Sequence, residues 1–228
     1  MQQSSPSGRR LLFVGDSITD AFRRPEEANE SYRMGNGFAF MVVASLRDRY
    51  APLDWVFENR GVAGETLKMI ERRWESDLGT EPLHWLSCLI GVNEVIRRHW
   101  EEPERSEPPE FEERYRRMLE AARARHPDLQ LILAEPFLVR AGIVTPEWRD
   151  WLRPYQAAVH RLAEGLGAVF LPLQSVFDAA CEIAPAEYWA FDGIHPTPPG
   201  FRRIARCWLD RVEPVLIEQG HLPAPTAG

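Results

Sequence analysis

The sequence has few cysteines, and none of them lies at the spacing of a metal or redox site. Its 228 residues include Cys88, Cys181 and Cys207, each in an apolar or helical context. An odd number without C-x-x-C spacing favours buried free thiols, although a disulfide between two of them stays open. Free thiols are typical of a reducing compartment.

Long hydrophobic runs are also missing. No stretch approaches the roughly 18 consecutive apolar residues that a membrane-spanning helix needs, so we expect no membrane segment. Residues 1–10 (MQQSSPSGRR) contain no apolar core of a secretory signal, and their arginines do not precede a hydrophobic stretch. The sequence therefore predicts a soluble, cytoplasmic protein.

Basic side chains are outnumbered. The chain has 27 lysines and arginines against 34 aspartates and glutamates, a formal net charge of -7. This balance argues against nucleic acid or an anionic membrane as the main partner, and it accommodates a neutral or cationic small molecule.

Cofactor signatures are lacking as well. The Gly15-Asp16-Ser17 stretch has neither G-x-G-x-x-G spacing nor the lysine of a phosphate-binding loop. Five histidines are scattered without a partner at metal-ligand spacing. We therefore expect neither a cofactor nor a metal. These histidines are His84, His99, His126, His160 and His221.

What the sequence does contain is a regular alternation of apolar strands and amphipathic helices. This alternation predicts one domain over residues 1–228, an α/β fold whose three layers (α/β/α) enclose a five-stranded parallel sheet. We expect residues 1–9 to be flexible, 219–228 to be a tail, and 21–36 and 98–109 to be loops. Strands are expected at 11–14, 55–57, 85–90, 129–135 and 168–171, and helices at 37–50, 66–78 (with Thr66 as cap), 110–125, 146–165, 174–181 and 198–212.

A candidate nucleophile follows the first strand. The apolar run Leu11–Val14 passes directly into a polar turn that contains Ser17. In open parallel sheets the carboxyl ends of the strands form the ligand-binding edge, so a hydroxyl there is well placed to attack a substrate. Asp16 is expected to fix this turn as a hydrogen-bond acceptor.

A candidate acid and base lie near the other end of the chain. Asp192 and His195 are three residues apart, with Gly193 between them and Pro196 preventing a helix. A carboxylate that accepts from an imidazole fixes its tautomer, so the other ring nitrogen can take a proton from a serine. Ser17, His195 and Asp192 would then form a catalytic triad.

Two further strand ends offer donors for an oxyanion hole. Backbone N–H groups of Ser17 and Gly64 and the side-chain amide of Asn93 would meet if their strands are neighbours. Asn93 could instead cap a helix, and Gly61 is expected to serve only as a residue with positive φ.

Other residues near the expected site have two possible roles. Tyr188, Trp189 and Phe191 are expected to be core residues behind the Asp192 turn, with stacking on a sugar as the alternative. Arg33 and Arg60 lie in loops near strand ends, where we expect solvated surface rather than substrate contact.

The ordered motifs resemble the four blocks of the SGNH subgroup of GDSL esterases and lipases, over residues 11 to about 212. The resemblance implies a flavodoxin-like sheet of order 2-1-3-4-5, a triad of Ser17, Asp192 and His195, and an oxyanion hole of Ser17, Gly64 and Asn93. Glu94 departs from the aspartate that is usual after the asparagine. The blocks are Gly15-Asp16-Ser17-Ile18, Gly61-Val62-Ala63-Gly64, Gly91-Val92-Asn93-Glu94 and Asp192-Gly193-Ile194-His195-Pro196.

Within this family the chain is similar to the acetylxylan and carbohydrate acetyl esterases, through residues 59–66, 73–77 and 190–196. Phe191 stands where tryptophan is more usual. The resemblance implies a serine esterase that removes acetyl groups from xylo-oligosaccharides or related sugars. The alternatives are a lysophospholipase, a thioesterase, a general short-chain carboxylesterase, or a non-catalytic carbohydrate-binding protein. The eight tryptophans and the loop at 98–109 leave room for a homo-oligomer.

Overall fold

The structure is a computed structural model of the chain, and it describes residues 8–224. Five parallel strands form one sheet in the order β2-β1-β3-β4-β5. This order confirms the predicted fold. The strands are β1 (Arg10–Gly15), β2 (Val56–Asn59), β3 (Trp85–Leu89), β4 (Gln130–Ala134) and β5 (Val169–Leu171).

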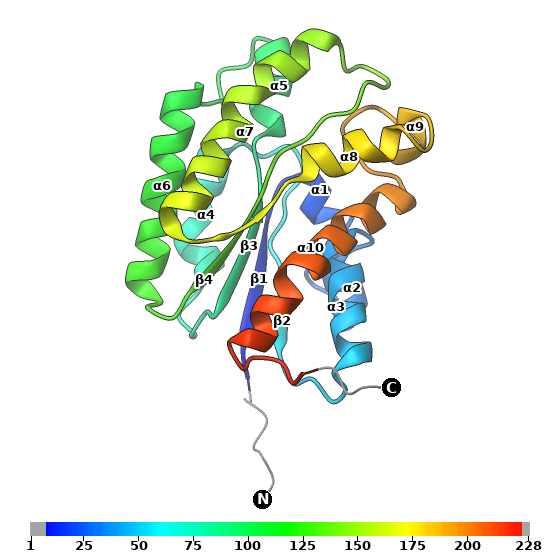
Figure 1. Cartoon of the computed structure of the whole chain (residues 1–228). Coiled ribbons are helices and arrows are strands. Elements are labelled where there is room, and N and C mark those ends of the chain that lie inside the picture. Colours follow the sequence, from blue (N-terminus) through cyan, green and yellow to red (C-terminus); the bar gives the residue numbers. More distant parts are fainter. Residues whose placement is uncertain (1–7, 225–228) are drawn as a thin grey trace, which may run out of the picture.

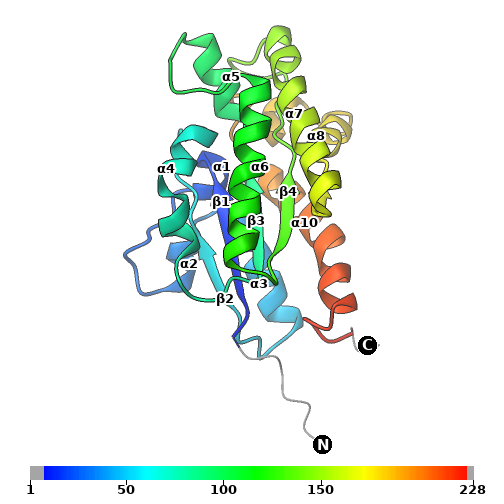
Figure 2. The ribbon, with the colours of Figure 1, turned by 90° about the vertical axis from the view of Figure 1, so that its left-hand side faces the viewer.

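Helices cover both faces of the sheet. Figure 1 shows α4, α6 and α7 on one side and α3 and α10 on the other, and Figure 2 shows the same layers after a quarter turn. The predicted three-layer arrangement is therefore confirmed. The helices are α1 (Ser17–Asp20), α2 (Glu30–Met34), α3 (Phe38–Arg49), α4 (Leu67–Leu78), α5 (Val92–His99), α6 (Pro108–Arg125), α7 (Pro146–Leu166), α8 (Leu173–Cys181), α9 (Ala186–Trp189) and α10 (Pro198–Glu218).

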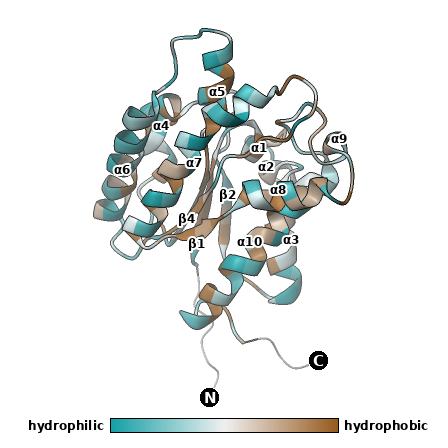
Figure 3. Cartoon of the chain, turned by 45° about the horizontal axis from the view of Figure 1, so that its top comes forward, coloured by the Kyte–Doolittle hydropathy of each residue, from teal (hydrophilic) through white to brown (hydrophobic). Residues whose placement is uncertain are grey.

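Strand β1 is central and buried on both faces. Leu11 to Val14 have no exposed surface, and β1 is hydrogen-bonded to β2 on one side and to β3 on the other. Figure 3 shows the apolar strands inside and polar residues on the outer faces of the helices. Burying a side chain of this size stabilises the fold by about 1.5–3 kcal/mol, so the apolar run that predicts β1 also anchors the turn after it.

Besides α1, which occupies the predicted serine turn, three helices lie where no helix was predicted. The predicted loop 21–36 contains α2, whose start is capped by the Asn29 Oδ1, which accepts from the Ser31 N–H at 2.9 Å. The segment after the third strand forms α5, and the aromatic turn contains α9. All three are short, and short helices depend on local caps and tertiary contacts more than on periodicity.

The chain packs further toward its C-terminus than expected. Leu222 is buried, and the Trp85 Nε1 donates to the His221 Nδ1 at 3.1 Å, so the expected tail does not begin at residue 219. At the other end, Arg9 O accepts from the Val56 N–H at 2.8 Å. Residues 1–7 and 225–228 of the two expected terminal segments lie outside the described residues.

The three cysteines are free, as predicted; Cys88 and Cys207 are buried and Cys181 is partly buried. Within residues 8–224, no helix combines the length and the apolar character that crossing a membrane requires.

Candidate active site

Three adjacent strands deliver the predicted site residues to one edge of the sheet. Ser17 opens α1 directly after β1, Gly64 lies in the turn between β2 and α4, and Asn93 lies in the first turn of α5 after β3. Because β2, β1 and β3 are neighbours and parallel, their carboxyl ends meet. The Asn93 Nδ2 donates to Glu65 O at 2.9 Å, which joins the second and third of these turns.

Ser17, His195 and Asp192 form a continuous hydrogen-bonded chain. The Ser17 Oγ lies 2.9 Å from the His195 Nε2, and the His195 Nδ1 lies 2.7 Å from the Asp192 Oδ2. Ser17 and Asp192 are 175 positions apart in the sequence, yet the sequence analysis predicted that they belong to one triad. Such an arrangement leaves the Nε2 free to take the hydroxyl proton when Nδ1 carries the other proton.

The Asp192 carboxylate is oriented by its own turn. Its Oδ1 accepts from the backbone N–H groups of Ile194 and His195 at 2.9 and 2.7 Å, which leaves the Oδ2 for the imidazole. Partial burial works to raise the pKa of Asp192, but the hydrogen bonds from the His195 side chain and from the two N–H groups outweigh it and lower that pKa. Asp192 is therefore held as an anion beside the imidazole.

Asp16 fixes the serine turn, as predicted. Its Oδ1 accepts from the Ile18 N–H at 3.0 Å and caps α1. Its Oδ2 is buried and has no partner within the described part of the chain. Burial raises the pKa of Asp16 to about 7, while the Ile18 N–H and the charge of His195 act in the opposite direction.

Two glycines near the serine have different roles from each other. Gly64 has a φ of +80°, which a residue with a side chain adopts only with strain. Gly61 does not have the positive φ that was predicted for it. Instead, a Cβ at Gly61 would lie 2.7 Å from the Thr19 carbonyl carbon, so glycine is required there by close packing against α1.

Two backbone N–H groups of the predicted oxyanion hole have no acceptor in the described part of the chain. Among residues 8–224, neither the Ser17 N–H nor the Gly64 N–H has a hydrogen-bond acceptor. The Asn93 amide uses one of its two hydrogens on Glu65 O and keeps the other. The arrangement can donate to an oxygen that gains negative charge.

The sequence matches the GDSL-like lipase/acylhydrolase family over residues 13–203. The chain belongs to this family. It is 30% identical to an acetylxylan esterase from Geobacillus stearothermophilus over 209 residues, 90% of this chain and 94% of the relative. Together these findings identify the protein as a carboxylic ester hydrolase.

Solved structures agree with this assignment. A structure described as a GDSL-like lipase from Parabacteroides merdae is 32% identical and superimposes with a TM-score of 0.84, covering 90% of this chain and 95% of that one. The acetylxylan esterase structure gives a TM-score of 0.80 at 29% identity, covering 90% and 94%. Variants of that enzyme described as catalytic mutants replace a serine, an aspartate or a histidine by alanine.

The aromatic residues near the turn that carries Asp192 and His195 divide into one buried and two exposed side chains. Trp189 is buried, as predicted, but Tyr188 and Phe191 are 55% and 62% exposed, so the prediction that they belong to the core is wrong. The Phe191 ring lies 6.1 Å from the His195 ring, with the two planes at 21°. A flat apolar surface therefore adjoins the imidazole.

Arg33 and Arg60 both bond to neighbouring residues, although Arg33 lies in α2 and not in the predicted loop. Arg33 donates to the backbone oxygens of Glu27 and Ala28, and Arg60 pairs with Glu58 at 2.8 Å. These contacts agree with the predicted surface role.

Two residues of α5 that the sequence did not indicate hold the turn after β2. The Glu94 Oε1 accepts from the Leu67 N–H at 3.0 Å, and the Arg97 Nη2 donates to Gly64 O at 3.1 Å. Within residues 8–224 the predicted cap, Thr66, makes no side-chain hydrogen bond, and Glu94 accepts from the first N–H of α4. If α5 had been predicted, the i, i+4 spacing would have placed Arg97 on the same helix face as Asn93 and so indicated it as a site residue.

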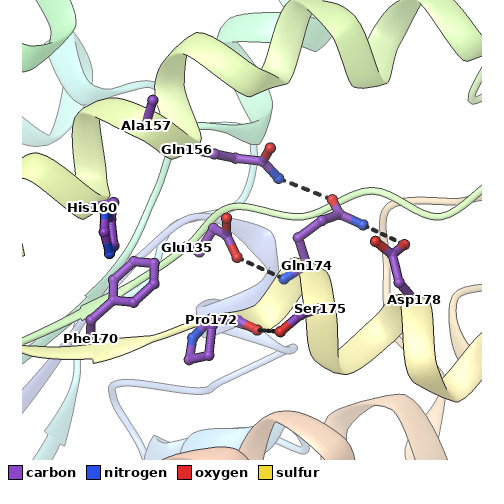
Figure 4. A pocket seen from close by; sticks show the side chains of 9 residues that line it. All are labelled: Glu135, Gln156, Ala157, His160, Phe170, Pro172, Gln174, Ser175 and Asp178. Carbon is purple, nitrogen blue, oxygen red and sulfur yellow. Dashed lines mark hydrogen bonds between the residues drawn. The ribbon is translucent and has the colours of Figure 1, made fainter.

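A hollow between α7 and α8, called here the α7–α8 hollow, lies apart from the predicted site residues. It measures about 420 Å³ and is bordered by α7, β5 and α8, with Glu135, His160 and Gln174 among its lining residues (Figure 4). None of the predicted site residues lines it. Within residues 8–224, no group of three or more side chains of histidine, cysteine, aspartate or glutamate is placed so that it could hold a metal ion.

Proposed function

We propose that this esterase removes acetyl groups from xylo-oligosaccharides or related acetylated sugars through an acyl-enzyme on Ser17. The observation that carries the mechanism is the hydrogen-bonded chain from the Ser17 Oγ through His195 to Asp192, with spacings of 2.9 and 2.7 Å. A serine is a weak nucleophile unless a positioned base removes its proton as it attacks, and this chain provides that base.

In the first half of the reaction the Ser17 Oγ attacks the acetyl carbonyl carbon while its proton moves to the His195 Nε2. Asp192 stabilises the imidazolium that forms. The negative oxygen of the tetrahedral intermediate accepts from the Ser17 and Gly64 N–H groups and from the Asn93 amide. The bond to the sugar oxygen then breaks, and that oxygen takes the proton from the Nε2.

In the second half, water attacks the acetyl group on Ser17 and gives a proton to the Nε2. The same three donors stabilise the second tetrahedral intermediate. The bond to the Ser17 Oγ then breaks, the serine recovers its proton from His195, and acetate leaves.

Two features support a sugar as the alcohol part of the substrate. The 30% identical relative is named an acetylxylan esterase, and related solved structures are described as acetyl-xylooligosaccharide esterases. The exposed Phe191 ring beside His195 offers an apolar face of the kind on which sugar rings stack. A net charge of -7 does not oppose a neutral substrate.

The test compares Ser17→Ala with Ser175→Ala, which removes an exposed serine hydroxyl in the α7–α8 hollow. Acetate release from acetylated xylo-oligosaccharides should disappear in Ser17→Ala and be unchanged in Ser175→Ala, with both variants folded. Full activity of Ser17→Ala on p-nitrophenyl acetate would refute the mechanism.

A panel of acyl esters tests the substrate. We expect acetyl esters of sugars to be hydrolysed faster than lysophospholipids, acyl thioesters or longer acyl chains. Faster turnover of a long-chain ester would replace the acetylated sugar by one of these substrates. A folded protein whose Ser17 resists an organophosphonate would instead indicate a non-catalytic binding protein.

A further inference from the structure

Three side chains of α5 contact the short turn that carries Gly64. Asn93 donates to Glu65 O at 2.9 Å, Glu94 accepts from the Leu67 N–H at 3.0 Å, and Arg97 donates to Gly64 O at 3.1 Å. These contacts come from positions 93, 94 and 97 of one helix and fall on successive peptide groups of the chain from Gly64 to Leu67. One rigid element therefore contacts the turn at three points.

We propose that Glu94 and Arg97 are positioning residues that hold the Gly64 N–H and the Asn93 amide in register for the oxyanion. This inference rests on the proposed function, since it assigns a role in forming the oxyanion hole of that reaction. Neither residue touches the substrate; each acts through the turn that carries Gly64.

Gly64 needs such support because its surroundings leave it free. A Cβ placed on Gly64 would meet no atom within 4 Å beyond the adjoining residues, so no group packs against that side of Gly64. The backbone hydrogen bond within its turn, from the Glu65 N–H to Val62 O, is long at 3.4 Å. A glycine with open space around it has wide conformational freedom, and a fixed donor direction then depends on what holds its carbonyl. Arg97 is the group that does so.

Glu94 connects the turn to a larger rigid body. Its side chain is fully buried, and its second oxygen accepts from the Ser106 N–H at 2.8 Å. The Tyr155 hydroxyl of α7 donates to Ser106 O at 2.7 Å. A buried carboxylate that accepts two N–H groups from different segments fixes the distance between them. The start of α4 is thereby tied to α5 and α7 rather than capped by its own Thr66.

The expected loss follows from what an oxyanion donor contributes. Removing one such donor outright lowers kcat by about 10²–10³. Loosening the turn misplaces the donor without removing it, so we expect about a 10- to 100-fold loss of kcat for Glu94→Gln and for Arg97→Met. Because the donors act on the transition state, KM should stay within about twofold of the wild-type value.

Each variant has a matched control in the same chain. Glu213, in the C-terminal half of α10, accepts from the Tyr50 hydroxyl at 2.6 Å, so Glu213→Gln removes a carboxylate that bonds to neither the Gly64 turn nor the Asp192 turn. Arg123 donates to Leu166 O at 2.7 Å, so Arg123→Met removes a comparable arginine to carbonyl bond. Both controls should keep wild-type kcat even where their thermal midpoints fall as much as those of the test variants.

Steady-state hydrolysis of p-nitrophenyl acetate is the assay, with Arg97→Lys as the conservative variant. An ammonium can still donate to Gly64 O, so Arg97→Lys should recover most of the kcat that Arg97→Met loses. In an Asn93→Ala background, Glu94→Gln and Arg97→Met should each cost less than in the wild type, since part of what they position is already gone.

Several results would overturn the inference. Wild-type kcat in Glu94→Gln and Arg97→Met, beside an inactive Ser17→Ala, would show that the turn needs neither residue. Losses that multiply fully with Asn93→Ala, or equal losses in the controls, would do the same. If Glu94→Gln fails to fold, the Arg97 series decides. Activity retained in Ser17→Ala would instead refute the proposed function.

Discussion

Asp16 is expected to make the stability of the protein depend on pH between about 4 and 7. Its carboxyl group is buried, its Oδ2 has no partner in residues 8–224, and burial raises its pKa from 3.8 to about 7. The folded protein therefore binds this proton more tightly than the unfolded chain does. As the pH rises from 4 to 7 the unfolded chain ionises freely while the folded protein resists, and stability is lost by about 4 kcal/mol.

Asp16→Asn isolates this contribution, because asparagine keeps the Oδ1 that caps α1 and cannot ionise. Urea unfolding of both proteins, followed by tryptophan fluorescence, gives the free energy of unfolding at each pH. Other buried carboxyl groups, such as Glu94 with its pKa raised to about 7 by burial, are present in both proteins and cancel in the difference. The variant should gain about 4 kcal/mol relative to wild type between pH 4 and 7, and nothing more above it. A difference that stays constant over this range would refute the reasoning.

Two further predictions concern the acid and base turn. Asp192→Asn should lower kcat by about 10³ to 10⁴ with little change in fold, because an amide can favour the wrong imidazole tautomer; p-nitrophenyl acetate kinetics with circular dichroism checks this, and a loss below tenfold would contradict it. Gly193→Ala should unfold at lower urea than Gly64→Ala, although both glycines have positive φ. A Cβ at Gly193 would overlap Ala141 O and lie 2.8 Å from Val139 O, whereas at Gly64 it meets open space, so equal midpoints would contradict the packing argument.

The sheet and the hydrogen-bonded chain at the serine could be predicted from sequence for a physical reason. A parallel strand buried on both faces must be continuously apolar, so the run Leu11–Val14 predicts such a strand. The carboxyl end of that strand then predicts the edge of the sheet where the site lies. The alternation of strands and helices then places Ser17 and Asn93 at the same edge of the sheet. His195 follows no strand, and its place beside Ser17 was predicted from its spacing to Asp192 and from the resemblance to the esterase family.

Contacts that depend on one particular loop path could not be predicted in this way. The close packing of Gly61 on α1, the exposure of Phe191 and the use of Glu94 in place of Thr66 each depend on how two segments distant in sequence approach one another. Periodicity gives the buried face of an element, but not which of several polar groups reaches a free N–H. The short helix α5 was missed for the same reason. Its first four residues are all buried, and two of them, Asn93 and Glu94, bond to the segment after β2.

Both functional turns are supported by residues other than those assigned to the triad and the oxyanion hole. The acid and base turn is held by the loop after β4: the Val139 N–H donates to Gly193 O at 3.0 Å and the Ile143 N–H to Asp192 O at 3.3 Å. The oxyanion turn is held by α5 through Glu94 and Arg97. The residues that contact substrate must have one chemistry, so they recur as motifs, whereas a carbonyl or an N–H can be held by many different groups. The supporting residues can therefore differ between relatives that share the motifs, which is consistent with a glutamate at position 94 in a chain whose other site residues follow the family pattern.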